Sequence, residues 1–131
     1  MADSALRPVH PETARRPAGH YNHGMAHGGL LFVAGQLPID PATGRRLISE
    51  PIGVQVRQAL ANLDAILCAA GSRRDLVLKT TVFVPDIALW DEVNAAYAEF
   101  FGSHRPARSI VPTGPLHFGL LVEIEAVAVL A

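Results

Sequence analysis

The stretch that decides the fold lies near the C-terminus and reads Leu120-Leu121-Val122-Glu123-Ile124-Glu125-Ala126-Val127-Ala128-Val129-Leu130. Its even-numbered residues are all apolar, and alternate side chains of a β-strand point to the same face of a sheet. The odd-numbered face carries Glu123 and Glu125 among leucine and valine, so it is less polar than a face open to water. The pattern predicts a strand with one face packed on helices and the other half-covered, most simply by another subunit.

A second strand-like segment, a few residues upstream, carries one arginine. It reads Pro106-Ala107-Arg108-Ser109-Ile110-Val111. A guanidinium group is always charged and offers a planar fork of donors that fits a carboxylate. An arginine placed among apolar residues therefore needs an anion. The sequence leaves two anions open: Glu123 or Glu125 across the sheet, or the carboxylate of a small ligand.

The rest of the chain predicts two helices and three further strands. In chain order we expect a hairpin from residues 21–26 and 30–36, a helix over 51–70, a strand over 76–84 and a helix over 87–101. The helical stretches repeat apolar residues at three- and four-residue spacing. The order of elements indicates an α+β domain, a mixed sheet with both helices on one face. Residues 1–18 are polar and contain several prolines, so we expect an irregular N-terminal arm before a domain over residues 19–131.

The composition limits the classes of function. Half of the 131 residues are hydrophobic and 18% are charged, which suggests apolar surface buried between subunits. The net charge of −1 gives no electrostatic footprint for nucleic acid or an anionic membrane. No apolar run approaches the roughly 20 residues of a membrane helix. We therefore expect a soluble, cytoplasmic oligomer, with the single cysteine, Cys68, as a structural thiol.

Seven sequence blocks occur in order along the chain. They are Gly19-His20-Tyr21, Val33-Ala34-Gly35-Gln36-Leu37-Pro38, Gln58-Ala59-Leu60-Ala61-Asn62-Leu63, Lys79-Thr80-Thr81-Val82-Phe83, Val93-Asn94-Ala95-Ala96-Tyr97, Pro106-Ala107-Arg108-Ser109 and Val122-Glu123-Ile124-Glu125-Ala126. With these blocks, the chain resembles the RidA (YjgF) family of enamine and imine deaminases over about residues 19–130. The resemblance implies a chorismate-mutase-like fold and a homotrimeric barrel with clefts between neighbouring subunits.

The same resemblance implies an activity and a set of site residues. Members of the family hydrolyse 2-iminopropionate and related imines, which are tautomers of 2-aminoacrylate, to 2-oxo acids and ammonia, and they use no cofactor or metal. By resemblance, Arg108 binds the substrate carboxylate and Glu123 positions the attacking water. Tyr21 lines the cleft, and Gly35 contributes a backbone contact.

Several expected cleft positions depart from the usual pattern of the family. His20 replaces a frequent proline, Ala34 a serine, the substrate-binding position Ile110 a cysteine, and His117 the proline of a Leu-Pro pair. Because the arginine and the glutamate are retained, imine hydrolysis is our main hypothesis. Two alternatives remain open: a specialised enzyme for a larger unsaturated amino or cyclic acid, and a metabolite-binding trimer without catalysis.

Three histidines near the first hairpin, His20, His23 and His27, invite comparison with a metal site. Zinc needs three or four ligands with matched geometry. In an extended strand only even spacings keep side chains on one face, and spacings of three and four are not both even. We therefore predict no metal here, and histidines that are solvated or line the cleft.

Overall fold

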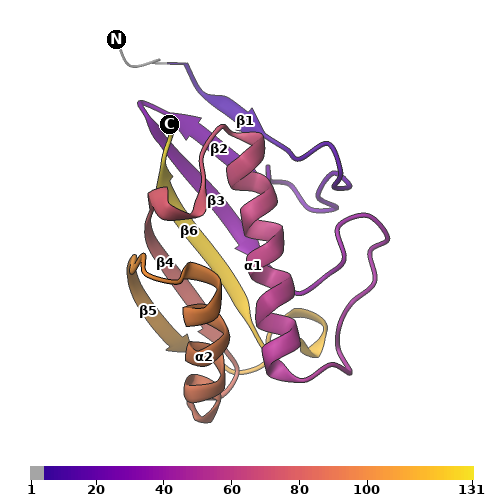
Figure 1. Cartoon of the computed structure of the whole chain (residues 1–131). Coiled ribbons are helices and arrows are strands. Elements are labelled where there is room, and N and C mark those ends of the chain that lie inside the picture. The colour runs from indigo at the N-terminus through magenta and orange to yellow at the C-terminus, as the bar shows by residue number, and fades with distance from the viewer. Residues whose placement is uncertain (1–4) are drawn as a thin grey trace.

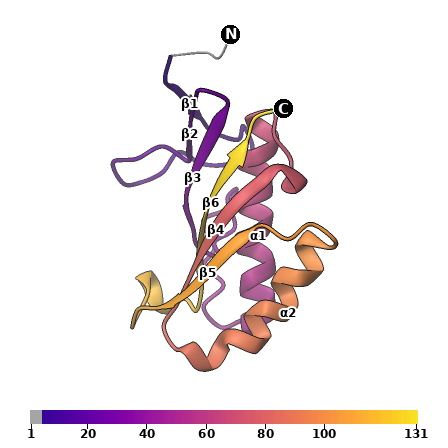
Figure 2. The same ribbon diagram turned by 90° about the vertical axis from the view of Figure 1, so that its left-hand side faces the viewer.

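The computed structural model describes residues 5–131 and contains one six-stranded sheet with two helices on one of its faces (Figures 1 and 2). The strands lie in the order β1-β2-β3-β6-β4-β5. Their bounds are Arg7–Val9 for β1, Gly24–His27 for β2, Leu30–Gln36 for β3, Val77–Val84 for β4, Ala107–Pro112 for β5 and Glu123–Val129 for β6. The pair β4 and β5 is parallel and the other neighbours are antiparallel, which confirms the predicted mixed sheet.

Both helices form where the apolar spacing predicts them. Helix α1 spans Ile52–Ala69 and follows Pro51, whose fixed φ suits a helix start. Gly71, just beyond its end, has a φ of 79°, a left-handed conformation that favours glycine. Helix α2 spans Trp90–Phe101, later than expected, because Ile87–Leu89 forms a separate 3₁₀ turn.

The N-terminal arm corrects one expectation. Residues 7–9 are not irregular, because they form β1 and pair with β2 in antiparallel register. The cause is burial: Val9 is only 3% exposed and joins the core, and β1 covers an edge of β2 that would otherwise be unpaired. Residues 1–4 of the expected arm lie outside the described residues.

The core lies between the sheet and the helices. The even-numbered residues of the last strand and its approach, from Leu120 to Ala128, are all buried there, as the alternation predicts. Neither α1 nor α2 covers the opposite face of the sheet (Figure 2), which exposes the apolar side chains of Phe32 and Val111 by 50% and 36%. We call this the open face. No helix within residues 5–131 is long and apolar enough to cross a membrane.

Candidate active site

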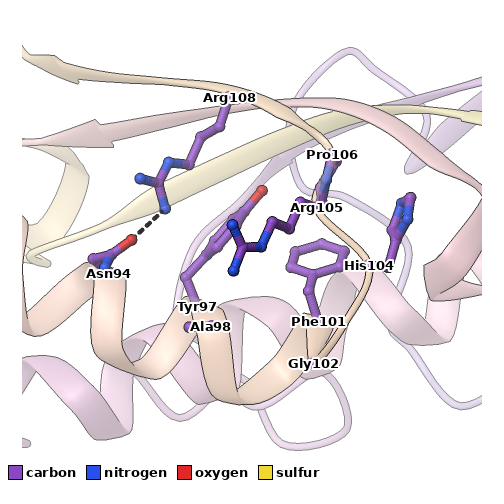
Figure 3. A pocket seen from close by; sticks show the side chains of 9 residues that line it. All are labelled: Asn94, Tyr97, Ala98, Phe101, Gly102, His104, Arg105, Pro106 and Arg108. Carbon is purple, nitrogen blue, oxygen red and sulfur yellow. Dashed lines mark hydrogen bonds between the residues drawn. The ribbon is translucent and has the colours of Figure 1, made fainter.

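Arg108 extends from the edge strand β5 toward α2 (Figure 3). In the parallel register it lies beside Thr80, which is fully buried and whose Oγ1 is 2.7 Å from the hydroxyl oxygen of Tyr97 on α2. Residues in register on neighbouring strands share a face of the sheet. Arg108 therefore lies on the helix-bearing face, at its edge.

The half-buried guanidinium of Arg108 is held by α2. Its Nη1 donates a hydrogen bond of 3.0 Å to Oδ1 of Asn94. Its central carbon lies 4.7 Å from the ring centroid of Tyr97 and 5.4 Å from that of Trp90, within the range of cation–π attraction. We call Arg108, Asn94 and Tyr97 the clamp half-site.

No carboxylate of the described chain pairs with Arg108. The four ion pairs found within residues 5–131 involve other arginines. The register explains why: Glu125 lies beside Thr81 and Glu123 beside Phe83, so both glutamates are on the open face. The alternative in which Arg108 pairs with Glu123 or Glu125 across the sheet is therefore wrong within one chain.

Glu123 sits at the start of β6 against the backbone of Gly35. A Cβ atom built on Gly35 would collide with Oε2 of Glu123 and lie 2.9 Å from its Cδ. The register between β3 and β6 shifts between Val33 and Gln36, and this irregularity brings Gly35 under the carboxylate. Gln36 stabilises this irregular backbone, because its Nε2 donates a hydrogen bond of 2.9 Å to the carbonyl oxygen of Ala34. Gly35 is predicted to contribute a backbone contact, and in the structure its backbone lies close to the carboxyl group of Glu123.

One hydrogen bond fixes the backbone near Glu123, and the surroundings of Glu123 change its pKa. The fully buried Gln55 on α1 accepts a hydrogen bond of 2.9 Å from the backbone N–H of Leu121, which fixes the approach to β6. Burial, followed by repulsion from Glu125, raises the pKa of Glu123, while the nearby His117 opposes this rise. Glu123 is therefore a carboxylate with an increased tendency to hold a proton.

His117 belongs to a short 3₁₀ turn, His117–Gly119, on the open-face side of the sheet (Figure 2). Its ring stacks on Phe118 with 3.5 Å between centroids, and the guanidinium of Arg46 lies 3.5 Å from the Phe118 ring centroid. Phe118 has a φ of 63°, an unusual conformation for a residue other than glycine. We call Glu123, Gly35 and His117 the carboxylate half-site.

A cleft lies between the C-terminal half of α2 and the segment that leads into β5 (Figure 3). Its volume is about 510 Å³. The clamp half-site borders it, together with Phe101, His104 and Arg105. The cleft therefore offers an arginine with an unpaired charge, next to space for a small ligand.

The remaining predicted site residues lie in different parts of the structure. Ile110 lies on the same face as Arg108 and packs on the core, half-buried. Tyr21 precedes β2 and is 56% exposed, and its hydroxyl has no hydrogen-bond partner among the described residues. His23 binds the carbonyl oxygen of Arg15 through Nε2 at 2.9 Å. No group of three or more His, Cys, Asp or Glu within residues 5–131 is placed to hold a metal ion.

Asn94 and Tyr97 are site residues to which sequence reasoning assigned no role. Both occur in the Val93–Tyr97 block, three residues apart, so they share one face of α2. Asparagine is a poor residue for a helix interior, and its presence there is a usable signal of a specific side-chain contact. The sequence does not identify the partner of Asn94, because that depends on the position of α2 beside β5.

Comparison with solved structures places the fold in a known class. TdcF of E. coli, solved with bound serine, superposes with a TM-score of 0.88 at 33% identity, covering 95% of this chain and 99% of that one. The YjgF gene product of E. coli superposes with a TM-score of 0.87 at 38% identity, covering 94% of this chain and 98% of that one, which confirms the predicted α+β fold class.

Sequence comparison gives the family. The family model described as Endoribonuclease L-PSP matches residues 12–130. A RutC family protein of Pyrococcus horikoshii is 42% identical over 120 residues, which are 92% of this chain and 94% of that protein. The 2-iminobutanoate/2-iminopropanoate deaminase of Salmonella typhimurium is 41% identical over 121 residues, covering 90% and 93% of the two chains. The chain belongs to the RidA (YjgF) family.

Proposed function

We propose that this protein hydrolyses 2-imino acids, and their enamine tautomers of the 2-aminoacrylate type, to 2-oxo acids and ammonia. Relatives named 2-iminobutanoate/2-iminopropanoate deaminase, at 41% and 40% identity, support this class of reaction. The observation that carries the proposal is the state of Arg108. Among residues 5–131 its half-buried charge has only the neutral Asn94 as a hydrogen-bond partner, so it is available for a substrate carboxylate.

The two half-sites are joined, in this proposal, between neighbouring copies of a homotrimer. The clamp half-site lies on the helix-bearing face at the β5 edge, and the carboxylate half-site lies on the open face. One chain cannot bring both to the same substrate molecule. The exposed apolar side chains Phe32 and Val111 favour association through the open face.

The chemistry follows from the groups in the two half-sites. Arg108 holds the carboxylate of the imine, which orients its C=N carbon. Glu123 accepts a proton from a water molecule as the water oxygen bonds to that carbon of the protonated imine, giving a neutral carbinolamine. Glu123 then returns the proton to the nitrogen and takes up the hydroxyl proton as the C–N bond breaks, so that the C=O bond forms and ammonia leaves. A raised pKa suits this role, because the same carboxyl group must take up and release a proton.

The test is turnover of freshly generated 2-aminoacrylate and 2-iminobutanoate, with 2-oxo acid release measured against the spontaneous rate. We expect acceleration by the wild type and its loss in Arg108→Ala. A matched control is Arg73→Ala, which removes an exposed arginine paired with Asp75 and should retain full activity. No acceleration with any imine, or equal acceleration by Arg108→Ala, would refute the proposal.

Two additional measurements separate the alternatives. Light scattering tests the trimer, and a fully active monomer at micromolar concentration would contradict a site shared between subunits. Calorimetry with 2-oxobutanoate tests binding apart from turnover. Binding that depends on Arg108 without any product formation would assign the protein to the non-catalytic, metabolite-binding class.

A further inference from the structure

The cleft beside Arg108 contains a second guanidinium group, that of Arg105 (Figure 3). Its lining also includes His104, whose Nε2 is occupied by a contact of 2.8 Å with the carbonyl oxygen of Val77. No aspartate or glutamate of residues 5–131 lines the cleft. Neither arginine takes part in an ion pair within residues 5–131. The cleft therefore has two positive charges and no negative charge of its own.

Four other arginines of this chain have acidic partners within residues 5–131, whereas the exposed Arg7 and Arg16 have none there. Arg45, Arg57, Arg73 and Arg74 pair with Glu50, Glu99, Asp75 and Asp64, at distances between 2.7 and 3.8 Å. Arg105 instead precedes Pro106 and Arg108 on the one segment that forms the β5 side of the cleft. An exposed arginine without a partner is ordinary on a protein surface. An arginine lining the same cleft as a substrate-binding arginine is a candidate for ligand recognition.

The size of the cleft agrees with a ligand longer than a three-carbon acid. Its volume of about 510 Å³ lies within the range of roughly 300–1,000 Å³ that holds drug-sized ligands. The lining also includes the aromatic rings of Tyr97 and Phe101, whose centroids are 4.7 Å apart. An aliphatic chain placed on these rings with an anion at each end would satisfy both charges.

We propose that Arg105 determines substrate specificity by binding a second carboxylate, so that the preferred imines are those of acidic amino acids. This inference rests on the proposed function, because Arg108 must bind the first carboxylate. Arg105 is solvent-exposed, so its contribution is that of a partly screened ion pair. The expected preference is about 2- to 5-fold in kcat/KM for a diacid over a monoacid, attributable to Arg105.

The first experiment compares imines generated in place by amino-acid oxidases from glutamate, aspartate and alanine. In Arg105→Gln we expect kcat/KM to fall about 2- to 5-fold for the two diacid imines and to stay unchanged for the alanine imine. Arg73→Gln is the matched control and should change neither value. Equal effects of Arg105→Gln on diacid and monoacid imines would overturn the inference and leave the proposed function intact.

The second experiment measures binding and does not depend on turnover. Calorimetry compares 2-oxoglutarate with 2-oxobutanoate, two unreactive 2-oxo acids, on wild type and Arg105→Gln. We expect tighter binding of the diacid by the wild type, and a preference that disappears in the variant. This result without turnover of any imine would overturn the proposed function and retain only the binding of a second carboxylate by Arg105. Equal affinities of the wild type for the two acids would overturn the inference.

Discussion

Replacing Gly35 by alanine tests directly whether the missing side chain at this position allows the carboxyl group of Glu123 to take its place. The φ of Gly35 lies outside the left-handed region, so the backbone accepts alanine without strain. The new Cβ would lie 2.9 Å from Cδ of Glu123, whereas carbon atoms in contact prefer about 3.5–4.0 Å. The carboxyl group must therefore move by about 1 Å. A misplacement of this size in a catalytic group lowers the rate on the order of 100-fold, or about 2.7 kcal/mol in the activation barrier.

Stability should change little in the same variant. The colliding atoms belong to the end of a flexible side chain, which can move aside. The alanine also restricts the unfolded chain, which stabilises the fold by about 0.4–1 kcal/mol and offsets part of the strain. We therefore expect imine turnover to drop while the urea midpoint stays close to that of the wild type.

Two companion variants make the result specific. Gly53→Ala in α1 places a Cβ no closer than 3.7 Å to Arg57, so it should keep full activity and gain about 1 kcal/mol in stability. Adding Gly35→Ala to Glu123→Gln should lower turnover little further, because the displaced carboxylate is already gone. Full activity of a folded Gly35→Ala variant, or two effects that simply multiply, would refute the reasoning.

Three further predictions concern the charges of the two half-sites. Burial and Glu125 raise the pKa of Glu123 above its ordinary 4.5, so the native state holds the proton more tightly than the unfolded chain, and the free energy of unfolding falls as pH rises from about 4.5 through the native pKa. Glu123→Gln should abolish this fall, measured by urea unfolding at a series of pH values. An unchanged pH dependence of stability in the variant would contradict the prediction. His117→Gln removes a charge that lowers the pKa of Glu123, so the acid limb of the plot of kcat/KM against pH should move to higher pH. An acid limb at the wild-type pH would contradict an electrostatic role of His117. Asn94→Ala should raise KM about 10-fold, because Arg108 loses the only hydrogen bond it makes within residues 5–131. Asn94→Asp should abolish substrate binding by neutralising Arg108, and tighter binding by this variant would show that the clamp does not bind an anion.

Most of the fold can be predicted from local patterns. The alternation of residues 120–130 predicts which side chains of β6 are buried, and the spacing over residues 51–70 predicts α1 to within a residue at each end. The strand β1 could not be predicted this way. Three residues carry too little periodicity, and their conformation depends on pairing with the edge of β2.

The candidate site is less predictable because its geometry depends on strand register. The alternation of the last strand places Glu123 on the face opposite the helices, but the sequence does not say which face Arg108 occupies. That is decided by the pairing of Thr80 with Arg108 in the parallel register of β4 and β5. The close approach of Gly35 likewise follows from an irregularity between β3 and β6, which a single sequence does not reveal.

Register also explains how both charges stay available for chemistry. A slip of one residue in the pairing of β5 with β4 would turn Arg108 to the open face, where Glu123 and Glu125 lie. An ion pair would then neutralise the clamp and lower the pKa of the glutamate, which would remove both properties that the proposed reaction needs. On opposite faces, Arg108 keeps an unpaired charge and Glu123 keeps a raised pKa. In the proposed trimer the two groups meet only at a seam between copies, where the substrate carboxylate, and not Glu123, is the anion that Arg108 binds.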